Sequence, residues 1–258
     1  MGDHRFNDRL GSVSVEDATR RNEFIKGIVD RLKTVVDGSS LNDNDGLNAD
    51  ILTRLLNQRL SNFKFEQYYT PITNRGGFHV DFPELPNRVP LKTEDDFRNY
   101  ISRLGQFKRL AEEHVEIMTA GMAKGYSLPG VVLDGYEETI TSNIVEDPKD
   151  SLLFKPFQEF PEGIDEDAQK KLRSECLAAI QDSVLPGYQL FHKFMSEEYI
   201  PKARDTIAAS ALPNGREFYR YCVRRYTTLD LLPEEVHETG KREVARICLL
   251  YTSDAADE

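Results

Sequence analysis

Apolar residues recur every three or four positions along most of the chain, which is the spacing of one helical face. Between residues 15 and 36, Phe24, Ile28, Leu32 and Val35 form an apolar stripe that we expect to be buried, and Ser14 is placed to cap the helix. Comparable segments lie at residues 47–62, 97–104, 110–122, 167–183, 216–226 and 233–247. The pattern predicts a mainly α protein built as an array of many helices.

The segment near residues 68–90 departs from the helical spacing. It is rich in Tyr, Phe, Pro and Gly, and Phe78, Val80 and Phe82 alternate with polar residues. Because this alternation is typical of a strand, we expect one short extended or strand-like segment here, or a long ordered loop. Gly76 and Gly77 come just before it and permit another segment to approach the backbone closely.

Residues 212–247 carry the longest ordered run of local signals. Pro213, Asn214 and Gly215 are turn residues, and a segment with helical spacing follows them. Pro233 then opens a second helix, followed by two acidic residues that suit its positive end. Gly240 lies on the apolar stripe of that helix, where Gly costs about 1 kcal/mol relative to Ala. It would be tolerated if another backbone approached closely.

This run resembles the signature segment of the bacterial family catalogued as domain of unknown function 885, a helix-rich family grouped with zinc-dependent peptidases. The family pattern joins L-P-N-G-x-x-x-Y, T-T and P-E-E-[IV]-H-x-x-G-x-x-E-V-x-R-I. The matching residues are Leu212–Gly215, Tyr219, Thr227–Thr228, Pro233–His237, Gly240 and Glu243–Ile247. Leu232 departs from the pattern, since a Ser or Thr cap commonly precedes the proline. The resemblance extends over nearly all of residues 1–247.

The resemblance implies a zinc ion and a peptide substrate in the full-length parent protein. A similar Gly-Gly segment in the family implies that Gly76 and Gly77 line the substrate groove, although a loop packing its aromatic residues on the helices explains them as well. Arg204, Tyr219 and His237 are further candidates for contacting the substrate, because cations and hydroxyls bind peptide carboxylates and carbonyls. Solvated helix faces, and for His237 a hydrogen bond between helices, are the alternative explanations.

The chain itself carries no recognisable metal motif. His237 and Glu238 begin a sequence similar to H-E-x-x-H, but Lys241 stands where the second histidine should be, and its charge would repel a metal ion. The family's H-E…P-G-H-H string does not occur in residues 1–258, and the five histidines are scattered. A G-x-S-x-G elbow and a phosphate-binding glycine loop are also absent from the sequence. We expect no catalytic residue, metal site or cofactor in this chain.

Composition narrows the possible partners. The formal net charge of −11 argues against nucleic acid or an anionic membrane as the main partner, because phosphate surfaces repel it. No apolar run reaches the ~20 residues that span a bilayer. The three cysteines lack C-x-x-C spacing, so neither a disulfide framework nor a thiolate zinc site is indicated. These observations do not predict a compartment.

Both ends of the sequence need separate interpretation. Residues 248–258, CLLYTSDAADE, resemble the read-through translation of a transposase sequencing adapter, although an ordinary acidic tail is the alternative. Residues 1–10 resemble an early family segment that usually follows further residues. We therefore expect residues 1–247 to be the truncated N-terminal helical part of the family domain, and residues 248–258 to be an artefact.

Two hypotheses of different classes follow. In the first, the chain is the N-terminal helical portion of a zinc-dependent, peptidase-like hydrolase, forms a wall of its substrate cleft, and is inactive alone. In the second, the fold is a non-catalytic protein that binds a peptide or another ligand. A complete metal motif downstream would favour the first hypothesis, and a degenerate one the second.

Overall fold

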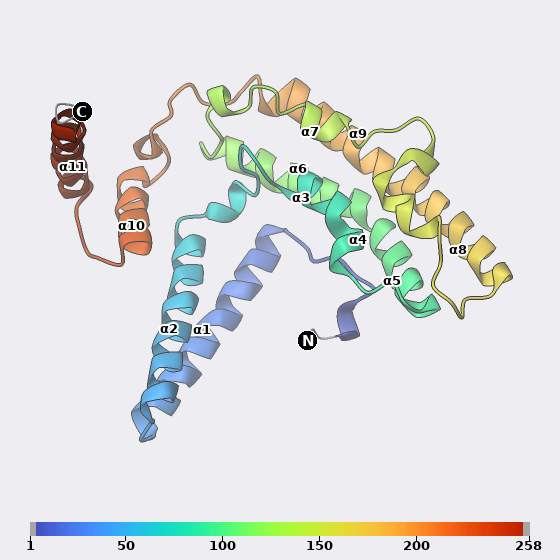
Figure 1. The fold of residues 1–258 in the computed structure, drawn as a ribbon, viewed down its shortest axis with the longest axis horizontal. Coiled ribbons are helices and arrows are strands. Elements are labelled where there is room, and N and C mark those ends of the chain that lie inside the picture. The colour runs from blue at the N-terminus through green and yellow to red at the C-terminus, as the bar shows by residue number, and fades with distance from the viewer. Residues whose placement is uncertain (1–3, 255–258) are drawn as a thin grey trace. The chain divides into compact units, whose positions relative to one another are not determined.

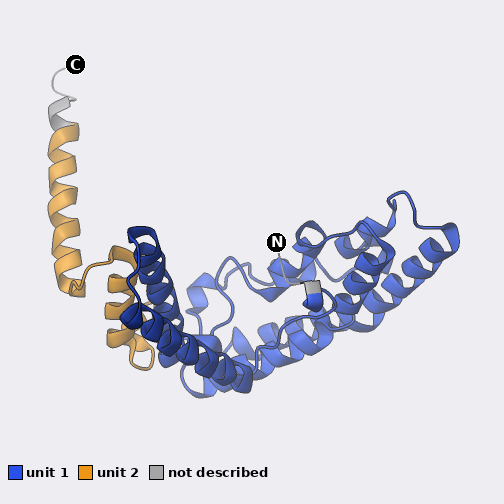
Figure 2. Cartoon of the chain, turned by 90° about the horizontal axis from the view of Figure 1, so that it is seen from below, with its two compact units in different colours: residues 1–206 blue, residues 207–258 orange. Residues whose placement is uncertain are grey.

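The structure is a computed structural model that describes residues 4–254, with the side chains of residues 5–251 (Figure 1). Its described residues form helices and no β-strand, so the prediction of a mainly α multi-helix array is confirmed. The chain divides into two compact units, residues 1–206 and residues 207–258 (Figure 2).

The first unit contains nine α-helices and several short 3-10 or π-helical turns among its described residues. The α-helices are α1 (Val15–Gly38), α2 (Asp43–Lys64), α3 (Phe78–Asp81), α4 (Leu85–Arg88), α5 (Glu94–Leu104), α6 (Phe107–Ala123), α7 (Glu138–Thr141), α8 (Glu166–Ala179) and α9 (Leu185–Phe194). The short turns are η1 (His4–Phe6), η2 (Gln67–Tyr69), η3 (Phe82–Glu84), η4 (Gly130–Val132), η5 (Pro148–Asp150), η6 (Leu152–Phe157), η7 (Ile180–Val184) and η8 (Met195–Tyr199).

Local capping sets the starts of the long helices. Ser14 accepts a hydrogen bond from the Asp17 backbone N–H, which begins α1 where the sequence predicted. Asn42 caps α2 in the same way through the Asp45 N–H. Thr93 and Asp96 form a reciprocal capping box at the start of α5. Each cap depends only on residues three apart, so its side-chain types can be read from the sequence.

The α1–α2 pair buries less than the apolar spacing predicted. Ile28 and Leu32 are half-buried, but Phe24 is 70% exposed and Val35 is 54% exposed. The expected fully buried stripe was therefore wrong for these two residues. The reason is that α1 packs along a single neighbour, α2, which covers only a narrow face of it (Figure 1).

The core of the unit lies where α5 and α6 pack along α8 and α9 (Figure 1). Phe107 of α6 and Tyr188 of α9 stack with ring centroids 4.6 Å apart, and both side chains are buried. Gly187 permits this contact, because a Cβ there would lie 2.7 Å from the Phe107 ring. Ser183 contributes from η7 by accepting a 3.1 Å hydrogen bond from the Lys108 N–H, one of the donors that α6 cannot satisfy internally.

Pro186 does not break the long helix that runs from α8 to α9. Proline inside a helical pattern is typical of a kink or a helix junction, because it lacks the N–H that an α-helix needs. The π-helical turn η7 ends directly before α9, and Pro186 occupies the first turn of α9. The local widening of the helix is the adjustment that accommodates the proline.

The segment near residues 68–90 contains no strand. Residues 70–77 are largely non-helical, and the chain then forms α3, η3 and α4 in succession. Phe78 and Phe82, four residues apart, both pack on Phe107, at centroid distances of 5.8 and 4.2 Å. The spacing of Phe78 and Phe82 that suggested a strand also places them on one face of a helix. Pro83 and Pro86 fit the first turns of η3 and α4.

The second unit consists, among the described residues, of η9 (Ala209–Ala211), α10 (Gly215–Thr227) and α11 (Pro233–Asp254). Asn214 adopts the left-handed conformation predicted for this turn, with φ of 53°. At Gly215 a Cβ would lie 2.1 Å from the Ala209 carbonyl oxygen, so only glycine fits between η9 and α10. Gly240 differs, because no described atom would approach its Cβ within 4 Å.

Candidate functional site

The Gly76–Gly77 loop leads the chain into α3. The Thr73 N–H donates a 2.8 Å hydrogen bond to the Gly76 carbonyl, which closes a tight turn. The Gly77 carbonyl accepts from the N–H groups of Val80 and Asp81 and so begins the helix. A Cβ at Gly77 would lie 2.9 Å from the Ile72 side chain and 3.0 Å from the His79 ring. Glycine is therefore needed at position 77 for close packing within the unit.

His79 lies directly beyond this loop and is wholly buried. Its Nε2 lies 3.2 Å from the Thr139 hydroxyl, which itself donates a 2.6 Å hydrogen bond to the Tyr136 carbonyl. Because that hydroxyl hydrogen is used, Nε2 must carry the proton that His79 donates to Thr139. The lone pair of Nδ1 then lacks a partner, and so does the buried Tyr136 hydroxyl.

Burial makes His79 a neutral group. Burial, with a smaller contribution from the nearby His114, lowers the pKa of His79 to about 4. His114 is stacked on Phe78 with ring centroids 3.9 Å apart, and its Nδ1 donates a 2.7 Å hydrogen bond to the Leu110 carbonyl. Burial also lowers the pKa of His114. The two rings are packed, uncharged parts of the core.

Arg204 connects the loop of residues 127–130 to residues 204–206 through hydrogen bonds. Its Nε donates a 3.0 Å hydrogen bond to the Ser127 carbonyl, and its Nη1 donates to the Thr206 carbonyl at 2.6 Å. The Arg204 carbonyl in turn accepts a 2.9 Å hydrogen bond from the Gly130 N–H. Partial burial lowers the pKa of the guanidinium. These contacts give Arg204 a positioning role for residues 127–130.

The remaining predicted residues belong to the second unit. Tyr219 lies on α10 and is 48% exposed, and His237 is exposed on α11. Lys241, one turn after His237, pairs with Glu238 at 2.9 Å, so the carboxylate of the H-E pair faces a cation. Gly76, Gly77 and Arg204 lie in the first unit, where Gly77 and Arg204 contact different residues.

The described side chains offer no place for a zinc ion. No group of three or more His, Cys, Asp or Glu residues among them has metal-binding geometry. Cys176 is buried, and burial raises the pKa of its thiol, which disfavours the thiolate that zinc requires. Cys222 is half-buried, with its pKa raised for the same reason.

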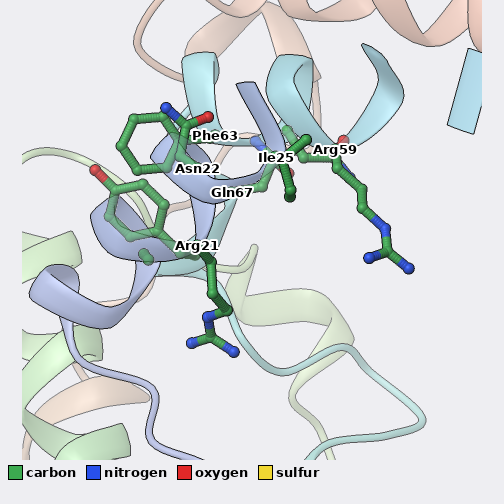
Figure 3. A pocket seen from close by; sticks show the side chains of 9 residues that line it. Arg21, Asn22, Ile25, Arg59, Phe63 and Gln67 are labelled. Carbon is green, nitrogen blue, oxygen red and sulfur yellow. The ribbon is translucent and has the colours of Figure 1, made fainter. Parts of the chain in front are cut away.

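A pocket lies elsewhere in the first unit, between α1, α2 and η2 (Figure 3). Its volume is about 350 Å³. Its residues come from three separate elements and form no motif, so the sequence did not predict the pocket. The only signal in the sequence was the polar Asn22 between apolar positions of α1.

A family model described as "Bacterial protein of unknown function (DUF885)" matches residues 1–249. A solved structure described as that of a "putative lipoprotein from Colwellia psychrerythraea" is similar, with a TM-score of 0.79 and 21% sequence identity. The similarity covers 94% of this chain and 43% of that one, so the chain spans less than half of the solved protein. No curated protein matches the sequence. None of the described helices is long and apolar enough to cross a membrane.

Proposed function

Because the chain belongs to the family of bacterial proteins of unknown function DUF885, we propose that it is the N-terminal helical portion of a zinc-dependent, peptidase-like hydrolase. In this proposal the chain forms one wall of the cleft that receives a peptide substrate. The observation that carries it is the family match through residue 249, which includes the whole signature run from Leu212 to Ile247.

The described residues of this chain do not fit the zinc ion itself. The described side chains contain no group of three metal-binding residues, and the two buried histidines are held by the core. We therefore assign no catalytic residue here and derive no step through the metal. In the proposal, the metal and the groups that act on the peptide bond come from outside this chain.

The proposed contribution of this chain is to bind and position the peptide. In the second unit, the exposed Tyr219 and His237 supply hydrogen-bonding groups for this role. In the first unit, the half-buried Gly76–Gly77 loop supplies backbone to the wall of the groove. Arg204 acts indirectly, since its guanidinium is used to hold residues 127–130 in place.

The second candidate function is a non-catalytic protein that binds a peptide or another ligand. The pocket between α1 and α2 favours it, because a volume of about 350 Å³ falls in the range of small-molecule sites. This function requires no metal and no residues beyond those described.

The test begins with the gene, read past the codon for Ile247. If the frame continues into H-E…P-G-H-H, we expect the longer protein to hydrolyse peptides, and to lose that activity when a chelator removes zinc. The chain of 258 residues should hydrolyse none and should retain far less than one zinc per chain after dialysis. Stoichiometric zinc in the short chain, or peptide binding without hydrolysis by the longer one, would contradict the proposal.

Tyr219→Phe in the longer protein tests whether the chain forms part of the cleft. Loss of a hydroxyl that binds the peptide should raise KM about tenfold and leave kcat nearly unchanged. The reason is that the hydroxyl binds the substrate equally well in the ground state and in the transition state. The matched control is Tyr226→Phe, because Tyr226 is an exposed tyrosine on the same helix, α10. Equal KM values for the two variants would remove Tyr219 from the site.

A further inference from the structure

The pocket between α1 and α2 is lined by two helical faces and the η2 turn. Its lining residues are Ala18, Arg21, Asn22, Ile25, Arg59, Asn62, Phe63, Gln67 and Tyr68. Those on α1 have i, i+3, i+4 and i+7 spacing, and those on α2 have i, i+3 and i+4 spacing, so each helix presents one face. Figure 3 shows the side chains that line the pocket, with Arg21 and Arg59 extending outward from α1 and α2.

Asn22 is the most informative residue of the lining. Its side chain is on the pocket wall, the residue is only 5% exposed, and its amide has no hydrogen-bond partner among the described residues. The amide atoms are not enclosed by protein, so they open onto the pocket and not into the core. An amide in this position can donate and accept hydrogen bonds with a ligand in the pocket.

The charged groups of the lining are both cations. Arg21 is held by hydrogen bonds from its Nε to the Asp17 carbonyl at 3.2 Å and from its Nη2 to the Ser12 carbonyl at 2.8 Å. Arg59 is exposed and makes no ion pair or hydrogen bond with any described residue. In Figure 3 the two guanidinium groups extend in the same direction from α1 and α2. Guanidinium groups of this kind suit a carboxylate.

The nearest acidic groups already have cationic partners. Asp17, one turn before Arg21, pairs with Arg20, and hydrogen bonds and the neighbouring arginines lower its pKa. Glu66, next to Gln67, pairs with Lys124 at 2.9 Å, and this contact lowers its pKa. Both carboxylates stay ionised and satisfied, so the pocket keeps its positive character in a chain of formal charge −11.

The other side of the pocket is aromatic. Phe63 and Tyr68 lie with ring centroids 5.4 Å apart, and Ile25 adds an aliphatic surface. Burial raises the pKa of Tyr68 to about 12, so its phenol remains a neutral donor at physiological pH. Such a wall binds a flat apolar body better than it binds a small, fully hydrated anion.

We propose that the α1–α2 pocket binds a small organic carboxylate with a flat apolar body. Arg21 and Arg59 hold the carboxylate, Phe63 and Tyr68 contact the apolar body, and the Asn22 amide pairs with a polar group of the ligand. This inference does not depend on zinc or on peptide hydrolysis.

The probe is phenylacetate, titrated into the full chain by isothermal calorimetry. Phenylacetamide lacks the charge, acetate lacks the ring, and inorganic phosphate is an anion without an apolar body. Saturable binding of phenylacetate, with each of the other three at least about tenfold weaker, is the expected result. Equal binding of phenylacetamide or of phosphate, or no saturable binding of phenylacetate, would overturn the proposal.

Arg59→Gln should weaken phenylacetate binding about tenfold, because an exposed, unpaired cation is removed from the site. Its matched control is Arg31→Gln, since Arg31 is exposed on α1 outside the pocket and should leave the affinity unchanged. Equal effects of the two substitutions would show that only net charge matters and would reject the site.

Asn22→Leu separates a binding role from a structural one. If the amide serves a ligand, replacing it with an apolar side chain of similar size should raise the Tm of the free protein and abolish phenylacetate binding. A lower Tm together with unchanged affinity would mean that Asn22 supports the fold, and the proposal would fail.

Discussion

His79 combines complete burial, an unpartnered Nδ1 and a pKa lowered from 6.5 to about 4. Sequence reasoning treated it as one of several scattered histidines, because burial is not visible in the spacing of residues. Its surroundings come from two other segments, one that contributes Tyr136 and Thr139 and one that contributes His114. At the scale of single residues, this environment makes a pH-dependent stability the clearest expectation.

We expect the free energy of unfolding to fall as the pH drops from 6.5 towards 4. In this range the unfolded chain binds a proton at His79 and the folded chain does not, so protonation favours unfolding. With about 1.4 kcal/mol per pKa unit, the loss attributable to His79 is roughly 3 kcal/mol. The lowered pKa of His114 contributes in the same direction. Urea unfolding at pH 7 and pH 4 measures the effect.

His79→Gln keeps an N–H that can reach Thr139 but cannot titrate, so the roughly 3 kcal/mol of pH dependence that we assign to His79 should disappear. The control His237→Gln changes an exposed histidine and should leave the pH dependence intact. A His79→Gln protein with the pH dependence of the original chain would show that other groups cause it.

At the scale of elements, the close contact between α6 and η2 depends on Gly121. A Cβ at this position would lie 2.9 Å from both the backbone oxygen and the Cβ of Tyr69. The glycine is therefore required by tertiary packing, although its place within a helix costs about 1 kcal/mol relative to Ala. Gly27, within α1, has no described neighbour that would meet a Cβ within 4 Å.

We expect Gly121→Ala to lower the free energy of unfolding by about 1–3 kcal/mol, because backbone atoms of η2 must move to make room. Gly27→Ala is the matched control and should raise stability by up to about 1 kcal/mol, through helix propensity alone. Urea unfolding of both variants at pH 7 provides the comparison. Stabilisation by Gly121→Ala would mean that the α6–η2 contact is looser than described.

Elements also differ in how well the sequence predicted them. Residues 146–166 are polar and interrupted by prolines, which is typical of a linker or surface loop, yet Leu153, Phe154 and Phe157 are buried in η6. The Tyr100 hydroxyl donates a 2.9 Å hydrogen bond to the Leu153 carbonyl and ties η6 to α5. The segment is polar and proline-rich on average, so its local composition does not indicate that three of its apolar side chains are buried.

At the scale of the whole molecule, large apolar side chains are exposed in both units. In the α1–α2 pair they include Phe24, Leu47, Ile51, Leu52 and Leu55, and on α11 they include Val244, Ile247, Leu249 and Leu250. Monomeric soluble proteins rarely expose extended apolar patches without a partner.

The isolated chain is therefore expected to bind a hydrophobic dye and to self-associate as its concentration rises. Phe24→Ser combined with Leu55→Ser should reduce both effects, because it removes two exposed apolar side chains of the α1–α2 pair. Val131→Ser is the control, since Val131 is equally exposed but lies on η4. Dye fluorescence and light scattering measure the outcome, and a monodisperse chain that binds no dye would refute the expectation.

The sequence by itself determined the helical class, the caps at Ser14, Asn42 and Thr93, and the Asn214–Gly215 turn. Each depends on interactions between residues close together in the chain, whose chemistry is readable from spacing. The family signature was readable for the same reason, because it is a local string. The roles of Gly76, Gly77, Arg204, Tyr219 and His237 in substrate binding stay predictions.

Only the tertiary structure decided which apolar faces are covered, whether Phe78 and Phe82 belong to a strand or to helices, and where Asn22 faces a pocket. These outcomes depend on partners far away in the sequence, such as Phe107 for the two phenylalanines and Arg59 for the pocket of Asn22. Burial is a property of several segments together, and no single segment encodes it.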